Sequence, residues 1–335
     1  MLFRSAADVT GRYDVRRDEA PFVIEVGSND GTLLREFAIE GWRALGIDPA
    51  AGPARIAAAA GLETIVDGFG SALAASVVID YGEADLVIAN NVAAHVADLD
   101  DFLAGLASLM RRNGSLIMEV QYVADLLTGN GFDMIYHEHR FFYSLSSLAA
   151  ALGRHDLAVV DVEHVGTQGG SLRVTARSRA AVGGKLRVSP QRQHNVSNAL
   201  YAERDLGQRD AYGGLQARAD RIGERLRAAL REVRSSGATV AGYGAPAKAT
   251  TLLHWTRTAD YLSWVEDTTP AKVGRFMPGH STRIPIVAPG DREKPDAYLL
   301  TSHNYLTHIL RREREFIDRG GRFVVPLPVP VVIGG

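Results

Sequence analysis

From Ala20 to about Arg177, short apolar runs alternate with helix-like segments, and few folds accommodate this pattern. The runs are bounded by Gly, Asn or Asp, as buried parallel strands followed by crossovers are. They predict strands over residues 22–26, 42–47, 85–89 and 115–120. We therefore expect a doubly wound α/β sheet. Two later runs, 157–164 and 171–176, are joined by a glycine-rich connection without a helix, which predicts an antiparallel hairpin at one sheet edge.

A second α/β pattern begins at Ala238 and predicts another Rossmann-like unit. Its expected elements are a helix over 247–255 and strands over 239–244, 261–265, 297–301 and 322–326. The prolines of the tail 326–330 exclude a central strand there. Apolar residues at helical spacing in the polar stretch before this pattern predict a long amphipathic helix over 211–236. The expected organisation is a first domain over 1–185, a helical linker over 186–237 and a second domain over 238–335.

Composition and charge exclude several classes of protein. The chain has 335 residues, a formal net charge of -2 and no cysteine, which excludes disulfides and thiolate-based zinc or iron–sulfur sites. Its histidines form no HExxH-like pattern, so we expect no metal. The near-neutral charge gives no reason to expect nucleic acid or an anionic membrane as a partner. The first apolar run, 21–24, is too short for a signal sequence or a membrane span, so a cytoplasmic location is expected.

The glycine turn after the first predicted strand is acidic, and its charge indicates the cofactor. Its sequence, EVGSNDG over 25–31, departs from GxGxxG, and a pyrophosphate there would be repelled by Asp30 and Glu25. S-adenosylmethionine (SAM) carries cationic amino and sulfonium groups instead. Asp48 ends the next strand, where an acid accepts ribose hydroxyls, although NAD would also use it. The other alternative is a tight turn without a ligand. The expected SAM-binding residues are Glu25, Gly27, Asn29, Asp30, Gly31, Asp48, Asp67, Gly68 and Asn90.

The segment 136–143, with sequence YHEHRFFY, is chemically the densest part of the chain. If it is extended, His137 and His139 share one face. Imidazole is well suited near neutral pH to take a proton from carbon beside a carbonyl. A second polar group, Asn91 to His95, follows the predicted strand 85–89, so we expect both groups at one cleft. His164, His254 and His308 are expected to be structural.

A second glycine turn, 242–248 with sequence GYGAPAK, also lies between a predicted strand and a helix. The helix amides and Lys248 predict a site for an anion, and Lys272 and Arg275 add positive charge downstream. The alternative is a degenerate Rossmann unit that serves as a scaffold.

Five motifs in this order resemble those of the bacterial sugar C-methyltransferases that act on nucleotide-linked deoxy-ketosugars. They are 25–31, NVAAH over 91–95, YHEHR over 136–140, GGSLR over 169–173 and the second glycine turn. The resemblance implies a class I methyltransferase domain for SAM, a C-terminal Rossmann-like domain, and acceptor binding between them. It implies that His139 is the base and that Tyr136, Glu138, His95 and Asn91 place the ketone and stabilise the enolate. The implied substrate-binding residues are His137, Gln168, Lys248, Arg275 and Asn304.

The sequence also departs from this family. Its members usually begin with a zinc-binding module built on cysteines, whereas here about twenty residues precede the first strand and cysteine is absent. Gln168 stands where the family commonly has histidine, and His303 where tryptophan is usual. The alternatives are therefore a SAM-dependent enzyme for a non-sugar ketone or a hydroxyl, a catalytically idle Rossmann scaffold, and a nicotinamide-dependent oxidoreductase, which Asp30 opposes.

Overall fold

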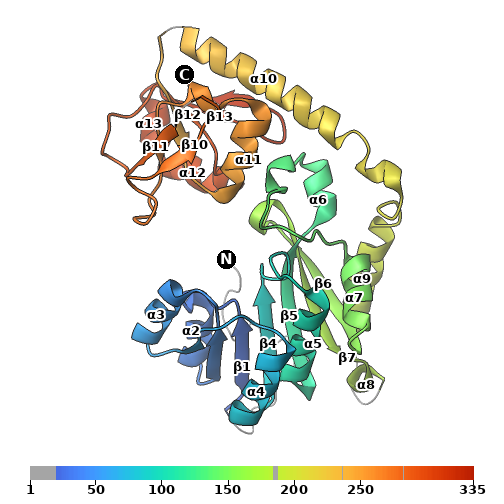
Figure 1. The fold of residues 1–335 in the computed structure, drawn as a ribbon. Coiled ribbons are helices and arrows are strands. Elements are labelled where there is room, and N and C mark those ends of the chain that lie inside the picture. The colour runs from blue at the N-terminus through green and yellow to red at the C-terminus, as the bar shows by residue number, and fades with distance from the viewer. Residues whose placement is uncertain (1–19, 184–187, 236, 282) are drawn as a thin grey trace. The chain divides into compact units, whose positions relative to one another are not determined.

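The computed structural model describes residues 20–183, 188–235, 237–281 and 283–335. These residues form two compact units (Figure 1). Unit 1 comprises the described residues within 1–123, 140–166 and 170–207, and unit 2 those within 124–139, 167–169 and 208–335. The predicted boundary at 185/186 and the segment before the first strand lie outside the described residues. The segment that carries Tyr136 and His139 groups with unit 2.

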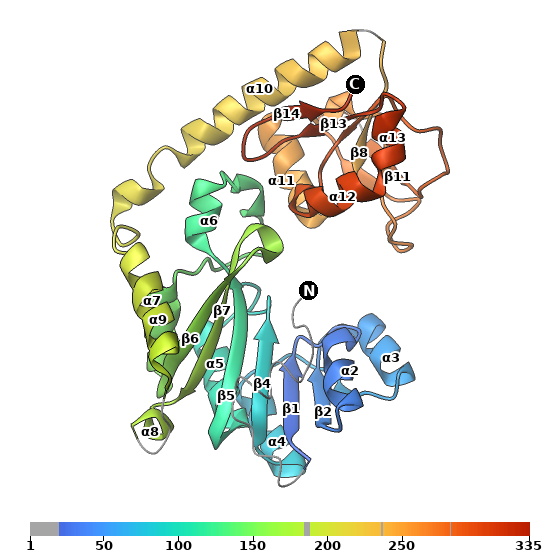
Figure 2. The same cartoon turned by 180° about the vertical axis from the view of Figure 1, so that it is seen from behind.

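Unit 1 is built on a seven-stranded sheet in the order β3-β2-β1-β4-β5-β7-β6 (Figures 1 and 2). The first five strands of this order are parallel, and β6 and β7 form the predicted antiparallel hairpin at the edge. The prediction of a doubly wound α/β sheet is confirmed. Among the described strands of this unit, sequence reasoning missed the short strand β3. The strands are β1 (Phe22–Val26), β2 (Arg43–Ile47), β3 (Glu63–Ile65), β4 (Ala84–Asn90), β5 (Met110–Gln121), β6 (Leu157–Val165) and β7 (Ser171–Ser178).

Helices cover both faces of this sheet because alternate residues of each strand point to opposite sides. In β1, Ile24 packs in the core that also contains Phe102 and Leu148, whereas Val23 packs with Leu34 and Phe37 on the other face. The helices of unit 1 are α2 (Thr32–Ile39), α3 (Ala51–Ala59), α4 (Ser71–Tyr81), α5 (Leu99–Leu109), α7 (Leu145–Gly153), α8 (Arg179–Val182) and α9 (Pro190–Ala202).

Unit 2 repeats the same plan with the strand order β10-β11-β9-β8-β12-β13-β14. Its five central strands are parallel, and β10 and β14 are antiparallel edges. The second Rossmann-like unit is therefore confirmed. The strands are β8 (Val240–Tyr243), β9 (Val265–Glu266), β10 (Phe276–Pro278), β11 (Arg283–Val287), β12 (Ala297–Leu299), β13 (Arg322–Val325) and β14 (Val331–Ile333). The strand predicted over 261–265 is wrong except at its end, because Ala259–Tyr261 forms a 3₁₀ turn closed by the Leu262 N–H on the Ala259 carbonyl.

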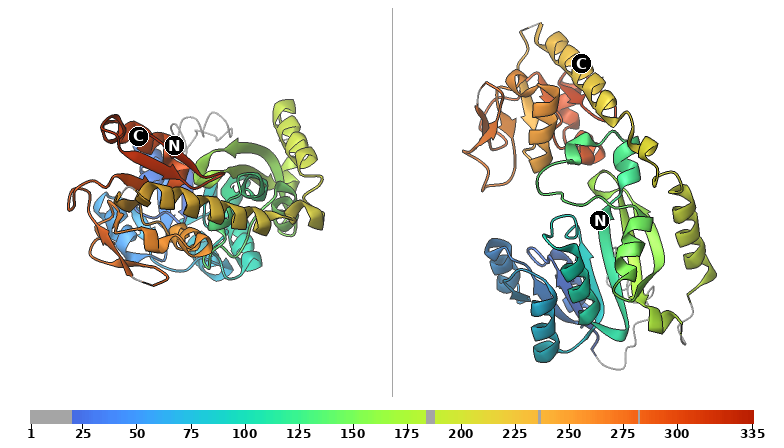
Figure 3. Two further views of the ribbon diagram at one scale, coloured as in Figure 1. Left: turned by 90° about the horizontal axis from the view of Figure 1, so that it is seen from above. Right: turned by 45° about the vertical axis from the view of Figure 1, so that its right-hand side comes forward.

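The predicted amphipathic helix is α10 (Leu215–Ser235), a single continuous rod in both views of Figure 3. Its predicted start at 211 is wrong, because Arg209–Tyr212 forms a separate 3₁₀ turn. Its buried stripe includes Ile222, Leu226 and Leu230, and it packs against α11 (Ala247–Thr256). Unit 2 also contains α6 (Val123–Thr128), apart from its first residue, together with α12 (Leu306–Arg312) and α13 (Arg314–Asp318). Within the described part of the chain, none of the helices combines the length and the apolar character that crossing a bilayer requires.

Candidate active site

The acidic glycine turn follows β1 at the carboxyl edge of the unit 1 sheet, where α/β proteins bind ligands. Gly27 and Gly31 have φ angles of 77° and 74°, which residues other than glycine rarely adopt. A Cβ on Gly27 would collide with a methyl group of Val92, and one on Gly31 would lie 2.5 Å from Cδ1 of Leu62. Both positions therefore require glycine for conformation and for space.

Glu25 places an unusual carboxyl group beneath this turn. Its side chain is buried, and burial, reinforced by the charges of Asp30 and Asp48, raises its pKa to about 8. Among the described residues, Oε2 of Glu25 has no hydrogen-bond partner. A buried acceptor beside two further carboxylates fits a cationic ligand such as the amino group of SAM, and it disfavours a phosphate.

The other acids of the turn are tied to the backbone. Asp48 is buried and accepts hydrogen bonds from the backbone N–H of Asn29 (2.9 Å) and of Ala50 (2.8 Å). It thereby holds the glycine turn to the end of β2. Asp30 is exposed and accepts from the backbone N–H and the hydroxyl of Thr32 in the first turn of α2. The exposed Asp67 accepts from the N–H of Gly68 in the loop after β3.

Two asparagines lie at the carboxyl end of β4, the strand adjacent to β1: Asn90 ends the strand and Asn91 follows it. Both amide atoms of the Asn90 side chain are buried and lack partners among the described residues, so they are available to a ligand. Asn91 has φ 57°, its N–H donates to the Glu119 carbonyl (2.8 Å), and its Nδ2 lies 3.4 Å from Oε1 of Glu119. Oε2 of the fully buried Glu119 pairs with Arg173 at 3.0 Å. This ion pair fixes the orientation of Asn91. His95 is exposed, and its N–H donates to the Val92 carbonyl.

In unit 2, Tyr136 and His139 form a hydrogen-bonded pair. Nε2 of the buried His139 lies 3.0 Å from the Tyr136 hydroxyl, and Nδ1 lies 2.8 Å from the Met134 carbonyl. Because a carbonyl only accepts, Nδ1 carries the proton, and Nε2 of the neutral ring presents its lone pair to the tyrosine O–H. Burial, with the charges of Glu138 and Asp133, raises the pKa of Tyr136, so its hydroxyl stays protonated. In the neutral form of His139, these contacts define the tautomer, with the proton on Nδ1.

The segment around this pair forms a turn, so the possibility that it is extended is wrong. The N–H of His139 donates to the Tyr136 carbonyl at 3.0 Å, which places residues three apart side by side. His137 and Glu138 are consequently exposed, with an Nε2–Oε1 separation of 3.8 Å. Tyr136 and His139 belong to unit 2, whereas Asn91 and His95 belong to unit 1.

Three of the expected substrate-binding residues lie in neighbouring turns of unit 2. Lys248 is buried in the first turn of α11, with Nζ 3.0 Å from Oδ2 of Asp133 and 3.2 Å from Oδ1 of Asn304. Gln168, with φ 53°, is exposed in a 3₁₀ turn that contacts the turn containing Asn304. Arg275 is exposed on the segment between β9 and β10.

Known proteins identify the family. The chain is 38% identical to the C-methyltransferase NovU of Streptomyces niveus over 320 residues, which covers 94% of this chain and 74% of that protein. The chain belongs to the C-methyltransferase family. The C-methyltransferase C-terminal domain matches residues 166–328, and a methyltransferase domain matches residues 2–162. These matches confirm the prediction that the chain is a SAM-dependent methyltransferase.

Solved methyltransferase structures align with about half of the length of this chain. Magnesium protoporphyrin IX methyltransferase (ChlM) from Synechocystis PCC 6803 with bound SAH is 18% identical, with a TM-score of 0.40 over 52% of this chain and 82% of that one. A SAM-dependent methyltransferase from Anabaena variabilis ATCC 29413 is 14% identical, with a TM-score of 0.42 over 52% and 84% of the chains.

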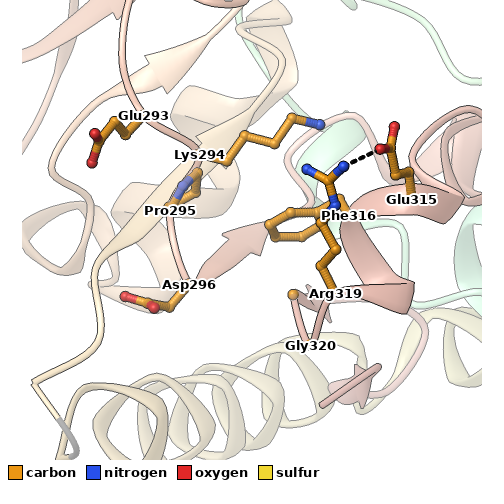
Figure 4. A pocket seen from close by; sticks show the side chains of 9 residues that line it. Glu293, Lys294, Pro295, Asp296, Glu315, Phe316, Arg319 and Gly320 are labelled. Carbon is orange, nitrogen blue, oxygen red and sulfur yellow. Dashed lines mark hydrogen bonds and ion pairs between the residues drawn. The ribbon is translucent and has the colours of Figure 1, made fainter.

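A cavity of about 450 Å³ in unit 2 of this C-methyltransferase is lined by none of the residues of the glycine turn 242–248 (Figure 4). Asp296 and Gly321, which line it, directly precede β12 and β13, so it opens at the amino ends of the parallel strands. Its side chains include the hydrogen-bonded pair Glu315 and Arg319. Since ligands of such sheets bind at the carboxyl ends, we do not assign it to the reaction.

Sequence reasoning missed two buried acids that support the candidate site, Glu119 and Asp133. Each is fully buried, and each interrupts an otherwise apolar stretch of the sequence. A carboxylate in such a position needs a partner within the protein. That mismatch is the signal that could have identified them. Within the described residues, no cluster of three or more metal-ligating side chains is present.

Proposed function

We propose that the chain transfers a methyl group from SAM to carbon, at a position α to a ketone, with His139 as the base. The supporting observation is the hydrogen-bond chain from the Met134 carbonyl through His139 to the Tyr136 hydroxyl, which leaves Nε2 as the basic atom. A histidine poised in this way is suited to abstract a weakly acidic C–H proton near neutral pH.

In the proposed reaction, the Tyr136 hydroxyl first turns away from Nε2 of His139. Nε2 then takes the α-proton of the ketone, and the C–H electron pair forms the enolate. The imidazolium so formed keeps its Nδ1–H bond to the Met134 carbonyl. Tyr136, still protonated, donates to the enolate oxygen, as an oxyanion-hole donor does. The amide of Asn91, His95 and Glu138 help to hold the ketone.

The methyl donor is proposed to bind at the acidic turn of unit 1. When bound, SAM would supply an electrophilic methyl group to the enolate carbon as its S–CH₃ bond breaks, and would be left as S-adenosylhomocysteine (SAH). The proton taken up by His139 would then return to solvent. Glu25 would accept from its amino group, Asp48 from its ribose hydroxyls, and Asn90 would satisfy further polar atoms. Asp67 and Gly68 are proposed to border the adenine. The unpartnered Oε2 of Glu25 and amide atoms of Asn90 support this assignment.

The proposed acceptor is a nucleotide-linked keto-deoxysugar. The ordered motifs of the sequence support it, as do the exposed polar side chains of His137, Gln168 and Arg275. A non-sugar ketone and a hydroxyl acceptor are the alternatives within SAM chemistry, and an idle scaffold is the alternative outside it.

The test compares two histidines two residues apart. Purified wild type, His139→Ala and His137→Ala are assayed with SAM against a panel of nucleotide ketosugars, simpler ketones and alcohols, with products detected by mass spectrometry. His139→Ala should lower kcat about 100-fold or more with unchanged SAH affinity, whereas His137→Ala, which removes only a proposed acceptor contact, should raise KM for the acceptor and leave kcat largely unchanged. Near-normal turnover of His139→Ala would refute the base. Products only from alcohols would refute carbon methylation, and no product from any acceptor would favour the scaffold.

A further inference from the structure

The turn that sets the His139 tautomer is itself held by buried charges. Met134 belongs to the 3₁₀ turn η1 (Phe132–Met134), and its neighbour Asp133 has a fully buried carboxylate. Oδ2 of Asp133 lies 3.0 Å from Nζ of Lys248 and 2.6 Å from Nε2 of His303. All of these residues belong to unit 2.

We propose that Lys248, Asp133 and His303 are positioning residues, whose ion-paired cluster fixes the Met134 carbonyl and thereby the tautomer of His139. This inference rests on the proposed role of His139 as the base. It gives Lys248 a function different from the anion site expected for it, because the anion that meets Lys248 is the carboxylate of the same chain.

One face of α11 is shaped to receive η1. Lys248, Leu252 and Trp255 follow one another at helical spacing of four and three residues. Leu252 shares a buried cluster with Phe132, and the Trp255 ring lies 6.2 Å from that of Phe132. The ion pair at the start of α11 and these apolar contacts further along therefore clamp the same turn.

The charges of the cluster match this structural role. Burial alone would raise the pKa of Asp133, but the hydrogen bond from His303 and the charge of Lys248 outweigh it and lower that pKa. The carboxylate is therefore ionised. Lys248 is buried too, which lowers its pKa, while the charge of Asp133 opposes that effect. Its Nζ lies within hydrogen-bond distance of Asp133, His303 and Asn304, which leaves little of it exposed to an external anion.

A buried ion pair that is broken on one side leaves an uncompensated charge, whereas removal of both charges is far better tolerated. The decisive variant is therefore the double substitution Asp133→Asn with Lys248→Met, compared with each single substitution. Lys294→Met is the matched control, because Lys294 pairs with Glu313 and its side chain is 55% exposed. SAH affinity and the thermal unfolding midpoint are measured for every variant.

The readout is the ring ¹⁵N NMR spectrum of the histidine-labelled full chain at pH 8, with the His139 signals assigned from their loss in His139→Ala. In the wild type and in Lys294→Met, the spectrum should show His139 with Nδ1 protonated and Nε2 unprotonated. The single variants should unfold at lower temperature. The double variant should recover most of that loss but show a mixture of His139 tautomers, with kcat lowered at least about tenfold and SAH affinity unchanged.

A double variant that folds, keeps the wild-type His139 tautomer and turns over normally would overturn the proposal. Failure of the double variant to fold would also overturn it, because the cluster would then be needed for the fold of the unit. Full activity of His139→Ala would instead refute the proposed role of His139 as the base. The NMR measurement of the tautomer separates the two proposals, because it needs no acceptor and does not depend on catalysis.

Discussion

The buried carboxyl of Glu25 makes the stability of the ligand-free protein depend on pH in a direction opposite to that of most carboxylates. Its pKa is raised from 4.5 to about 8 in the folded chain. Below pH 4.5 the Glu25 carboxyl is protonated in both the folded and the unfolded state, and its contribution to the free energy of unfolding is most favourable. As pH rises toward 8, only the unfolded state gains by losing the proton, so stability falls.

The size of this effect follows from the pKa difference. At about 1.4 kcal/mol per pKa unit, the carboxyl costs the folded state about 3 kcal/mol more at pH 8 than at pH 5. Glu25→Gln removes the titration and should flatten that part of the profile. Urea unfolding of wild type and Glu25→Gln at pH 5 and pH 8, without ligand, measures the difference. Glu36→Gln, on the exposed face of α2, is the control and should keep the wild-type profile.

The same carboxyl should affect SAH binding with the opposite sign. At pH 7 only about a tenth of Glu25 is ionised, so the affinity for the cationic amino group should rise several-fold between pH 6 and 7.5. Glu25→Gln should bind SAH at least about tenfold more weakly, without this dependence. If wild type and Glu25→Gln show equal pH profiles of unfolding and of binding, Glu25 is neither strained by burial nor a partner of the cofactor, and the reasoning fails.

Three further changes probe unit 1. Gly31→Ala should destabilise the protein by about 2–4 kcal/mol, because the alanine would have to adopt a left-handed backbone conformation and its methyl group would collide with Leu62. An unchanged urea midpoint would contradict this. Ser144→Ala should cost about 1 kcal/mol in urea unfolding, because Ser144 caps α7 in a capping box with Ser147, and its SAH affinity should not change. Asp48→Ala should weaken SAH binding in calorimetry without creating NAD binding; binding of NAD alone by the wild type would reverse the cofactor assignment.

Most of the fold could be predicted because its strands are apolar runs with glycine or acidic ends. The elements that were missed or misplaced, such as β3 and the start of β9, are short and depend on tertiary pairing, which one sequence window does not contain. The candidate site was predicted as a set of residue types. Its geometry was not, because His139 bonds to the Met134 carbonyl and the neighbouring Asp133 pairs with Lys248, which lies 115 positions away in the sequence.

Carbon deprotonation by His139 is the central claim, and solvent exchange tests it without methyl transfer. The acceptor ketone found in the panel is incubated in deuterium oxide without SAM, and its α-carbon is followed by NMR and mass spectrometry. With saturating acceptor, wild type and His137→Ala should introduce deuterium well above the buffer rate, and His139→Ala should not. Methylation by the wild type without any such exchange, or equal exchange by His139→Ala, would contradict the account.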